Sequence, residues 1–262
     1  MATKVGVMGA AGRMGATVCA VVHADPDLEL VAAADAVGRG QSIRSVGGPD
    51  TGLSIGGRIA DLVEAGSEVV VDFTVASAAR QNTLALAAAG VHAVVGTSGL
   101  TDDDIARFED AFVNSNCLVA PNFAISAVLM IRFAELAAPF FDTAEVIEYH
   151  HNQKVDAPSG TARETVRRLS EASDEWDQDP TQDEAVAGAR GGAGPAGIRV
   201  HGVRMKGMLA HQDVILGAEG QTLTIRQDSY DRSSFMPGVI LACKKISDHP
   251  GVTVGLDKFL GV

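Results

Sequence analysis

Hydrophobic residues in the first half of the chain fall in short runs that alternate with segments of helical periodicity. This alternation is typical of a parallel sheet covered by crossover helices. The predicted strands are residues 4–8, 28–34, 68–73, 92–96 and 117–120. The predicted helices are residues 14–24, 59–65, 76–89, a segment after Thr101, and residues 126–141. Residues 37–58 are rich in glycine and serine and predict mostly loop.

A different pattern begins after residue 142, where one helix accompanies several strands, as in an α+β domain. The predicted strands are residues 143–150, 198–205, 212–216 and 221–227, and the helix is residues 159–171. The polar, acidic segment 175–195 predicts a mobile connection. A helix at 237–246 and a strand at 252–254 can return the chain to the first domain. We therefore predict an α/β domain of residues 1–123 plus 232–262, with an α+β domain of residues 124–231 inserted in it.

Composition suits two ordinary domains in a reducing compartment. The 262 residues are 46% hydrophobic, but no run of about 18 apolar residues is present. The N-terminus lacks the pattern of a secretory signal. Cys19, Cys117 and Cys243 are widely separated and lie in apolar segments, as free thiols usually do. We therefore expect a cytoplasmic protein.

The charge of the chain limits its partners. A formal net charge of −12 repels phosphate backbones and anionic lipids, so we expect neither nucleic acid nor membrane as a partner. If a substrate or cofactor is an anion, its binding site must supply positive charge locally.

A glycine-rich turn lies between the first strand and the first helix. It reads Gly9-Ala10-Ala11-Gly12-Arg13-Met14-Gly15, and Asp35 ends the second strand 20 residues later. A turn in this place can present backbone N–H groups and a helix N-terminus to a pyrophosphate, while the acid binds an adenosine ribose. The spacing departs from the common G-x-G-x-x-G pattern, so a plain tight turn followed by an acid remains the alternative. The interpretation we adopt is a Rossmann-type dinucleotide-binding domain.

Asp35 also bears on the choice of cofactor. A carboxylate at the ribose accepts the free 2′-hydroxyl of NAD and repels the 2′-phosphate of NADP. Ala36 cannot hold that phosphate, although Arg39 in a flexible Gly-Arg-Gly could reach it. We expect NADH to be used at least as well as NADPH.

Two histidines and a lysine gather at the end of the strand 143–150. His150 and His151 point to opposite faces because they are neighbours in a strand, so they form a poor joint metal site. We predict no metal here. Asp102, Asp103 and Asp104 are likewise read as the first turn of a helix capped by Thr101. Together with Lys154, the histidines instead provide groups for proton transfer and local positive charge.

The helix that follows starts within the segment Asp156-Ala157-Pro158-Ser159-Gly160-Thr161. Proline, two hydroxyl residues and a glycine at a helix N-terminus can bind a carboxylate through N–H and hydroxyl groups. A plain N-cap is the alternative for Ser159. With Lys154 and a histidine nearby, the residues predict a site for a small acidic substrate.

One segment resembles the signature of the 4-hydroxy-tetrahydrodipicolinate reductase family, also called dihydrodipicolinate reductase, of bacterial and plant lysine biosynthesis. It covers residues 148–162 and reads Glu-Tyr-His-His-Asn-Gln-Lys-Val-Asp-Ala-Pro-Ser-Gly-Thr-Ala. The similarity covers nearly the whole chain and includes residues 9–15, 72–74, 96–99, 120–123 and 228–232. Ser98 stands where the family often has threonine, a change that keeps the hydroxyl.

The resemblance implies an NAD(P)H-dependent oxidoreductase of the diaminopimelate route, which delivers hydride to C4 of a conjugated cyclic imine. It implies His150 as the acid/base residue and Lys154 as the proton donor. The implied ligands of the dicarboxylate substrate are His151, Ser159, Gly160 and Thr161. The implied cofactor ligands are Gly9, Ala10, Ala11, Gly12, Arg13, Met14, Asp35, Phe73, Gly96, Thr97, Ser98, Ala120, Pro121, Asn122 and Phe123. The inserted domain would then bind substrate and join the chains of a homotetramer.

Two other functions stay open on the residues alone. One is a reductase of the same general build that acts on another small acidic substrate. The other is a dinucleotide sensor without catalysis, for which the glycine turn would suffice. The combination His-His-x-x-Lys with Ser-Gly-Thr favours the first family over both.

Overall fold

The computed structural model describes residues 2–262, and the chain divides into two compact units. The first unit runs to Phe123 and resumes with Phe235–Val262, and the second unit is Ala124–Ser234. The chain thus returns to the first unit at residue 235, whereas the sequence pattern placed the return at 232. The short 3-10 helix Arg232–Phe235 lies at this return.

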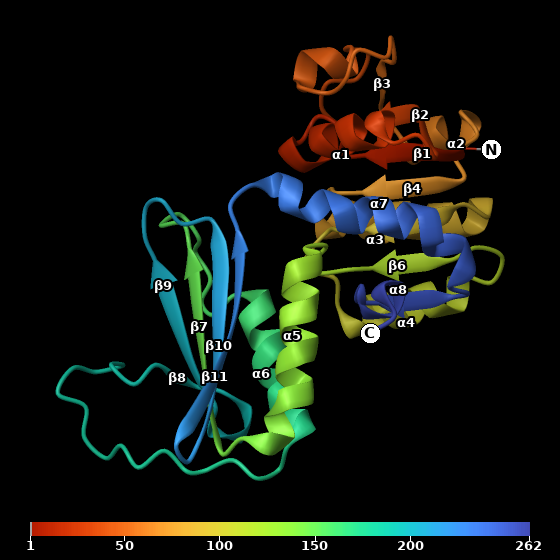
Figure 1. The fold of residues 1–262 in the computed structure, drawn as a ribbon. Coiled ribbons are helices and arrows are strands. Elements are labelled where there is room, and N and C mark those ends of the chain that lie inside the picture. Colours follow the sequence, from red (N-terminus) through yellow and green to blue (C-terminus); the bar gives the residue numbers. More distant parts are fainter. Residues whose placement is uncertain (1) are drawn as a thin grey trace. The chain divides into compact units, whose positions relative to one another are not determined.

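The first unit is built on a sheet with strand order β12-β6-β5-β4-β1-β2-β3, in which every pair of neighbouring strands is parallel (Figure 1). The strands are β1 (Thr3–Met8), β2 (Leu28–Ala34), β3 (Ile55–Gly56), β4 (Val69–Asp72), β5 (His92–Val95), β6 (Cys117–Val119) and β12 (Val252–Val254). Val7, Val70 and Val94 are fully buried, as expected for central strands covered on both faces. The prediction of a Rossmann-type parallel sheet is confirmed.

The helices of this unit connect the strands. They are α1 (Arg13–Ala24), α2 (Ile59–Glu64), α3 (Ala76–Ala89), α4 (Asp102–Ala111), α7 (Met236–Lys245), α8 (Asp257–Leu260) and the 3-10 turns Ile43–Val46 and Ile246–Asp248. Thr101 caps α4 as predicted, because its hydroxyl accepts from the N–H of Asp104 at 3.3 Å. Asp104 also pairs with Arg80, so this acid of the aspartate run is structural. β3 and α8 were not predicted, since two and four residues leave no periodic signal.

The second unit contains a mixed sheet in the order β11-β10-β7-β9-β8 (Figure 1). Its strands are β7 (Thr143–His150), β8 (Gly192–Ala193), β9 (Arg199–Arg204), β10 (Ala210–Ala218) and β11 (Gln221–Ser229). Its helices are α5 (Ile125–Ala137), α6 (Gly160–Ala172) and the 3-10 turns Ala138–Phe140 and Pro195–Gly197. Side chains of α5 and α6 share one core with Val146 and Val214 of the sheet. This is the predicted α+β unit.

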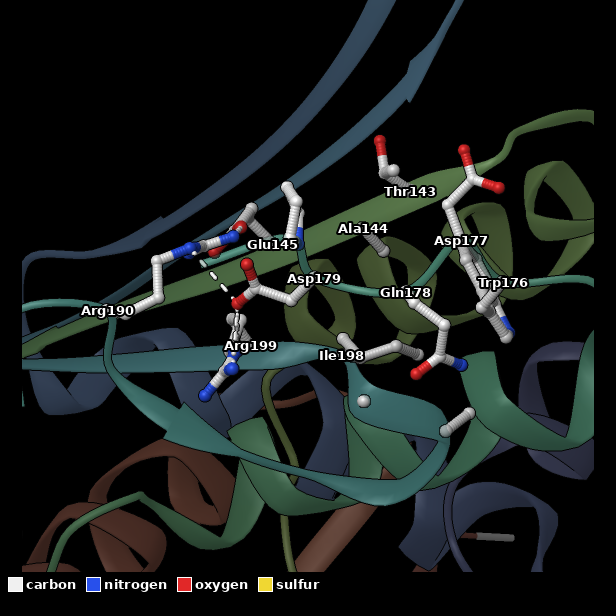
Figure 2. Close-up of a pocket in the computed structure, with 13 residues that line it drawn as sticks. Thr143, Ala144, Glu145, Trp176, Asp177, Gln178, Asp179, Arg190, Ile198 and Arg199 are labelled. Atoms are coloured by element: carbon white, nitrogen blue, oxygen red, sulfur yellow. Dashed lines mark hydrogen bonds and ion pairs between the residues drawn. The ribbon is translucent and has the colours of Figure 1, made fainter. Parts of the chain in front are cut away.

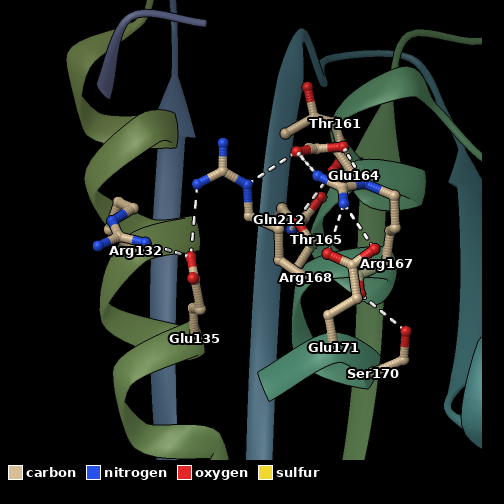
Figure 3. Close-up of polar contacts among 10 residues, drawn as sticks. All are labelled: Arg132, Glu135, Thr161, Glu164, Thr165, Arg167, Arg168, Ser170, Glu171 and Gln212. Atoms are coloured by element: carbon tan, nitrogen blue, oxygen red, sulfur yellow. Dashed lines mark hydrogen bonds and ion pairs between the residues drawn. The ribbon is translucent and has the colours of Figure 1, made fainter. Parts of the chain in front are cut away.

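The helix predicted for residues 126–141 is shorter than expected. α5 ends at Ala137, and a 3-10 turn over Ala138–Phe140 follows. Pro139 is the reason, because proline has no N–H to donate to the carbonyl four residues back and its ring clashes with that carbonyl. Figure 3 shows ion pairs that link α5 to α6. Glu135 accepts from Arg132 at 2.6 Å and from Arg168 at 3.4 Å.

The helices described over residues 2–262 include none with the length and apolar character needed to cross a bilayer.

Candidate active site

The glycine-rich turn joins the end of β1 to the start of α1. Gly9 has a left-handed backbone with φ of +86°, and the N–H groups of Gly9 and Ala10 donate to the carbonyl of Ala34 at 2.8 and 3.1 Å. A Cβ on Gly15 would lie 2.0 Å from the carbonyl oxygen of Gly9, so only glycine allows α1 to start this close to the turn. α1 begins at Arg13 without a side-chain capping hydrogen bond. Its N-terminal N–H groups and dipole are therefore suited to a phosphate.

Asp35 follows β2 and contacts the same turn. Its Oδ2 accepts from the N–H of Ala11 at 3.0 Å, and its Oδ1 accepts from the N–H of Val37 at 2.9 Å. A carboxylate offers about four lone-pair sites, so a sugar hydroxyl can still donate to it. The exposed side chain of Arg39 lies against Gly57, where an added Cβ would be 2.8 Å from its Cδ. The turn thus carries an acid suited to ribose, and a cation lies further along the same connection.

A buried hydrogen-bond network organises the carboxyl ends of β4 and β5. Asp72 is fully buried and accepts from the amide of Asn82 at 2.8 Å, the hydroxyl of Thr97 at 2.9 Å and the N–H of Thr74 at 2.9 Å. The hydroxyl of Thr97 is therefore occupied by its hydrogen bond to Asp72, whereas Ser98 is exposed. Asp72 was not predicted as a site residue. It shapes the loops that carry the predicted ones.

Two aromatic rings lie at the same edge of the sheet. The ring centroids of Phe73 and Phe123 are 5.8 Å apart. A Cβ on Gly96 would lie 2.2 Å from the ring of Phe73, so glycine is needed there. Ala120 and Phe123 are buried, while Pro121 is exposed. The residues that sequence resemblance assigns to the nicotinamide end follow β4, β5 and β6, at the strand ends where open α/β sheets bind ligands.

In the second unit, His150 ends β7 and Lys154 lies in the loop between β7 and α6. Their side chains are 16% and 20% exposed. The Nζ of Lys154 lies 2.7 Å from Oδ1 of Asp156, and this hydrogen bond lowers the pKa of Asp156. A ligand carboxylate at this place would compete with Asp156 for the ammonium group.

Glu148 is a fully buried carboxylate that sequence reasoning left without a role. Its Oε2 lies 2.5 Å from Nδ1 of His150, and the two terminal nitrogens of Arg204 lie 2.7 Å from its two oxygens. Burial alone would raise the pKa of Glu148, but the hydrogen bonds and charges of His150 and Arg204 outweigh it and lower the pKa to about 2. Glu148 is therefore ionised at neutral pH.

The alternation of side chains along each strand gives a sequence signal for the ion pair of Glu148 and Arg204. Glu148 shares a face of β7 with the buried Val146, and Arg204 shares a face of β9 with the buried Val200. Charged residues on the buried face of a strand are expected to be paired. The sequence alone does not show that β7 and β9 are neighbours.

The N-terminus of α6 is held to the same carboxylate. The N–H of Ser159 donates to Oε1 of Glu148 at 3.1 Å, and the hydroxyl of Ser159 accepts from the N–H of Ala162 at 3.1 Å. Ser159 is only 3% exposed and acts as the N-cap, which was the alternative interpretation for this residue. Gly160 is exposed and Thr161 is half-buried. The helix end that they form is therefore the part accessible to an anion.

Candidate metal ligands and cysteine thiols can be located in the described residues. Within residues 2–262, no three His, Cys, Asp or Glu side chains are grouped in a way that could hold a metal ion. The thiols of Cys19, Cys117 and Cys243 are buried. Burial raises the pKa of Cys19 and of Cys243 to about 12, so neither is a thiolate at neutral pH.

Figure 2 shows a hollow elsewhere in the second unit, beside Trp176 and the start of β7. It contains two arginines, but both are paired with carboxylates. Arg199 lies 2.7 Å from Asp179, and Arg190 pairs with Asp179 and Glu145. These charges are already neutralised, so the hollow is a poor site for a dicarboxylate. The contacts also anchor the connection 175–195 at Asp179 and Arg190.

Comparison with known families covers almost the whole chain. The family described as "Dihydrodipicolinate reductase, N-terminus" matches residues 3–123, and "Dihydrodipicolinate reductase, C-terminus" matches residues 126–260. A 4-hydroxy-tetrahydrodipicolinate reductase of Corynebacterium aurimucosum is 49% identical over 100% of both chains. The same enzyme of Streptomyces coelicolor is 43% identical over 98% of this chain and 97% of the relative.

Solved structures agree with this relationship. Dipicolinate-bound dihydrodipicolinate reductase from Paenisporosarcina sp. TG-14 has a TM-score of 0.87 and 36% identity, over 98% of this chain and 99% of that one. An amine dehydrogenase from Mycobacterium smegmatis has a TM-score of 0.64 at 13% identity, which shows a shared fold only. The chain belongs to the dihydrodipicolinate reductase family, the NAD(P)H-dependent oxidoreductases of the diaminopimelate route to lysine.

Proposed function

We propose that the chain reduces 4-hydroxy-tetrahydrodipicolinate, by way of dihydrodipicolinate, to tetrahydrodipicolinate, and that His150 and Lys154 carry the proton transfers. The observation that carries this assignment lies in the second unit. Glu148 contacts both His150 and Ser159, so a proton-transfer group and an anion-binding helix end are attached to one carboxylate. A dicarboxylate substrate needs both.

The substrate residues have distinct roles in this proposal. Lys154 attracts a substrate carboxylate and donates a proton, and His150 acts as acid or base. His151 and the first residues of α6, Gly160 and Thr161, hold the remaining carboxylate oxygens through donors near the helix N-terminus. Ser159 acts through its N-cap and not by contact with substrate, because its hydroxyl is buried in that bond.

The first unit holds the cofactor in this proposal. The turn of residues 9–14 binds the pyrophosphate and Asp35 binds the ribose. Loops of residues 96–98 and 120–123, with Phe73, surround the nicotinamide. The open N-terminus of α1 and the absence of a Cβ at Gly15 fit a pyrophosphate there. When bound, NAD(P)H supplies the hydride that reduces C4 of the imine. The chain positions both reactants and supplies the proton for the adjacent carbon.

One assay tests the proposed reaction. The condensation product of pyruvate and aspartate semialdehyde is supplied to the purified protein, and oxidation of NADH and NADPH is followed by absorbance. We expect turnover with at least one cofactor. A dinucleotide sensor would bind NADH without turnover, and a reductase of another substrate would oxidise neither cofactor with this compound. Either result would contradict the proposal.

Cofactor preference is a separate prediction. Asp35 already accepts from the glycine turn and adds negative charge at the ribose, which disfavours a 2′-phosphate. We expect kcat/KM with NADH to equal or exceed that with NADPH, measured under identical conditions. A preference for NADPH above about tenfold would be inconsistent with this role of Asp35 and would indicate that Arg39 binds the 2′-phosphate.

We further propose a cytoplasmic homotetramer joined through the sheet of the second unit. α5 and α6 both cover the face that carries Val146 and Val214. In this proposal another chain packs against the opposite face, which carries Ile147 and Ile215, both half-buried. Three buried free thiols fit a reducing compartment. Light scattering should give a mass of about four chains, and a monomer at micromolar concentration would count against the proposal.

A further inference from the structure

Glu148 receives contacts from three separate segments of the second unit. These are the end of its own strand at His150, the end of β9 at Arg204 and the start of α6 at Ser159. We propose that Glu148 and Arg204 form a positioning pair that holds His150 with its proton on Nδ1, so that Nε2 is the nitrogen that exchanges protons with the substrate. This inference rests on the proposed function and adds residues to which neither the sequence nor the family resemblance assigned a role.

The register of β7 and β9 brings Glu148, His150 and Arg204 together. Glu148 and His150 are two residues apart in β7 and so lie on one face. His150 is the direct neighbour of Arg204 in β9, and Glu148 is the neighbour of Gly202. A Cβ on Gly202 would lie 3.4 Å from Oε1 of Glu148, in van der Waals contact with it. A small residue at this place therefore leaves the buried carboxylate room beside the strand.

The charge of Glu148 decides which nitrogen of His150 carries the proton. Contacts with His150 and Arg204 keep the pKa of Glu148 at about 2 despite burial, so the carboxylate can only accept hydrogen bonds at neutral pH. Nδ1 lies 2.5 Å from it and must therefore be the donor. In the neutral ring this leaves Nε2 with a free lone pair, and in the charged ring it leaves Nε2–H as the acid.

Arg204 prevents Glu148 from being an uncompensated buried charge. Its side chain is 19% exposed, and its two terminal nitrogens contact both carboxylate oxygens at 2.7 Å. One of them also donates to the carbonyl of Asp156 at 2.7 Å. The same guanidinium thereby fixes the loop that carries Lys154. The pair thus joins the two proposed proton-transfer residues to one rigid group.

The other charged groups near His150 are known from the register and the loop. Ala210 is its neighbour in β10 and carries no charge. His151 follows it, and Lys154 lies in the loop with Asp156 as its partner. Among the described residues, Glu148 is the only carboxylate that forms a hydrogen bond or ion pair with the ring of His150. Glu148 is therefore the residue to change when the role of this contact is tested.

Glu148→Gln is the decisive variant, because an amide keeps the shape but reverses the hydrogen bond. Its oxygen can still accept from Ser159, while its NH2 can donate to Nδ1 and move the proton of His150 to Nε2. Loss of a carboxylate from such a histidine costs orders of magnitude in turnover. We expect kcat to fall about 10²-fold while KM changes less than about threefold. The kcat–pH profile should also change, because the variant removes the negative charge beside the ring.

Glu145→Gln is a matched control. Glu145 lies on the opposite face of the same strand and also pairs with a histidine and an arginine, His201 and Arg190. Its loss perturbs a similar ion cluster on the face proposed to join the chains, so it reports the structural cost of removing such a charge once light scattering shows an unchanged oligomeric state. We expect an unchanged pH profile. An equal loss of kcat in both variants, or an unchanged profile in Glu148→Gln, would overturn the proposal.

A second measurement does not require that Glu148→Gln folds or that the substrate is known. Side-chain ¹⁵N spectra of the wild-type protein, with His150 assigned by comparison with His150→Gln, report which ring nitrogen is protonated above neutral pH. We expect the proton on Nδ1. A proton on Nε2 would refute the positioning pair even in an active enzyme. Absence of turnover by wild type would instead refute the proposed function and leave the tautomer result standing.

Discussion

Replacement of Lys154 by alanine, or of His150 by glutamine, is expected to lower kcat by about 10²-fold or more while the affinity for NADH stays near that of wild type. Both residues lie in the second unit, whereas the glycine turn and Asp35 lie in the first. Each variant removes a proposed proton-transfer group, and neither changes a residue of the dinucleotide turn. Steady-state kinetics gives kcat, and equilibrium titration of NADH fluorescence gives the dissociation constant.

The two variants should differ in KM. Lys154 also attracts a substrate carboxylate, for which it must exchange its contact with Asp156 at 2.7 Å. We expect Lys154→Ala to raise KM for the substrate and His150→Gln to leave KM nearly unchanged. Lys258→Ala is the control, because Lys258 is an exposed lysine of α8 in the first unit. A loss confined to NADH binding in either variant would refute the assignment of these residues to proton transfer.

Gly15→Ala is expected to destabilise the first unit and to weaken NADH binding about tenfold or more. The added Cβ would lie 2.0 Å from the carbonyl oxygen of Gly9, 2.6 Å from its carbonyl carbon and 2.8 Å from Cα of Ala10. All three are backbone atoms, so relief requires α1 or the turn to shift. Overpacking of this kind costs about 1–3 kcal/mol, and a shifted turn no longer presents its N–H groups to a pyrophosphate.

Gly12→Ala separates the two effects in the same turn. Its added Cβ would meet one atom, the carbonyl oxygen of Gly9 at 3.2 Å, so the fold should lose much less stability. Thermal unfolding without cofactor compares the two variants, and NADH titration compares their affinities. Equal melting temperatures for Gly15→Ala and wild type would show that the turn adapts and that the expected strain is absent.

Local sequence patterns predicted much of the fold. The alternation of apolar runs with helical periodicity predicted the order of strands and helices, and the bounds of β2, α3 and β7 match it residue for residue. These elements are determined by period, by caps such as Thr101, and by the αL glycine at position 90, all of which act within a few residues. Pro139 is visible in the sequence as well, but the apolar run continues past it to Phe141, and the predicted helix was therefore too long.

The glycine turn, Asp35 and the cluster of His150, Lys154 and residues 156–161 were predicted as site residues from sequence, because each is a short motif next to a predicted strand or helix end. Only the tertiary structure showed which distant residues form hydrogen bonds with these motifs and with the loops around them. Asp72 connects β4 to Thr97, which is 25 residues away, and Glu148 meets Arg204 across 56 residues. Such partners depend on which strands lie side by side. β7 lies beside β9 and β10, and not beside β8, the next strand along the chain. The sequence by itself therefore determined the family and predicted the reacting groups, while strand pairing decided which buried charges contact them.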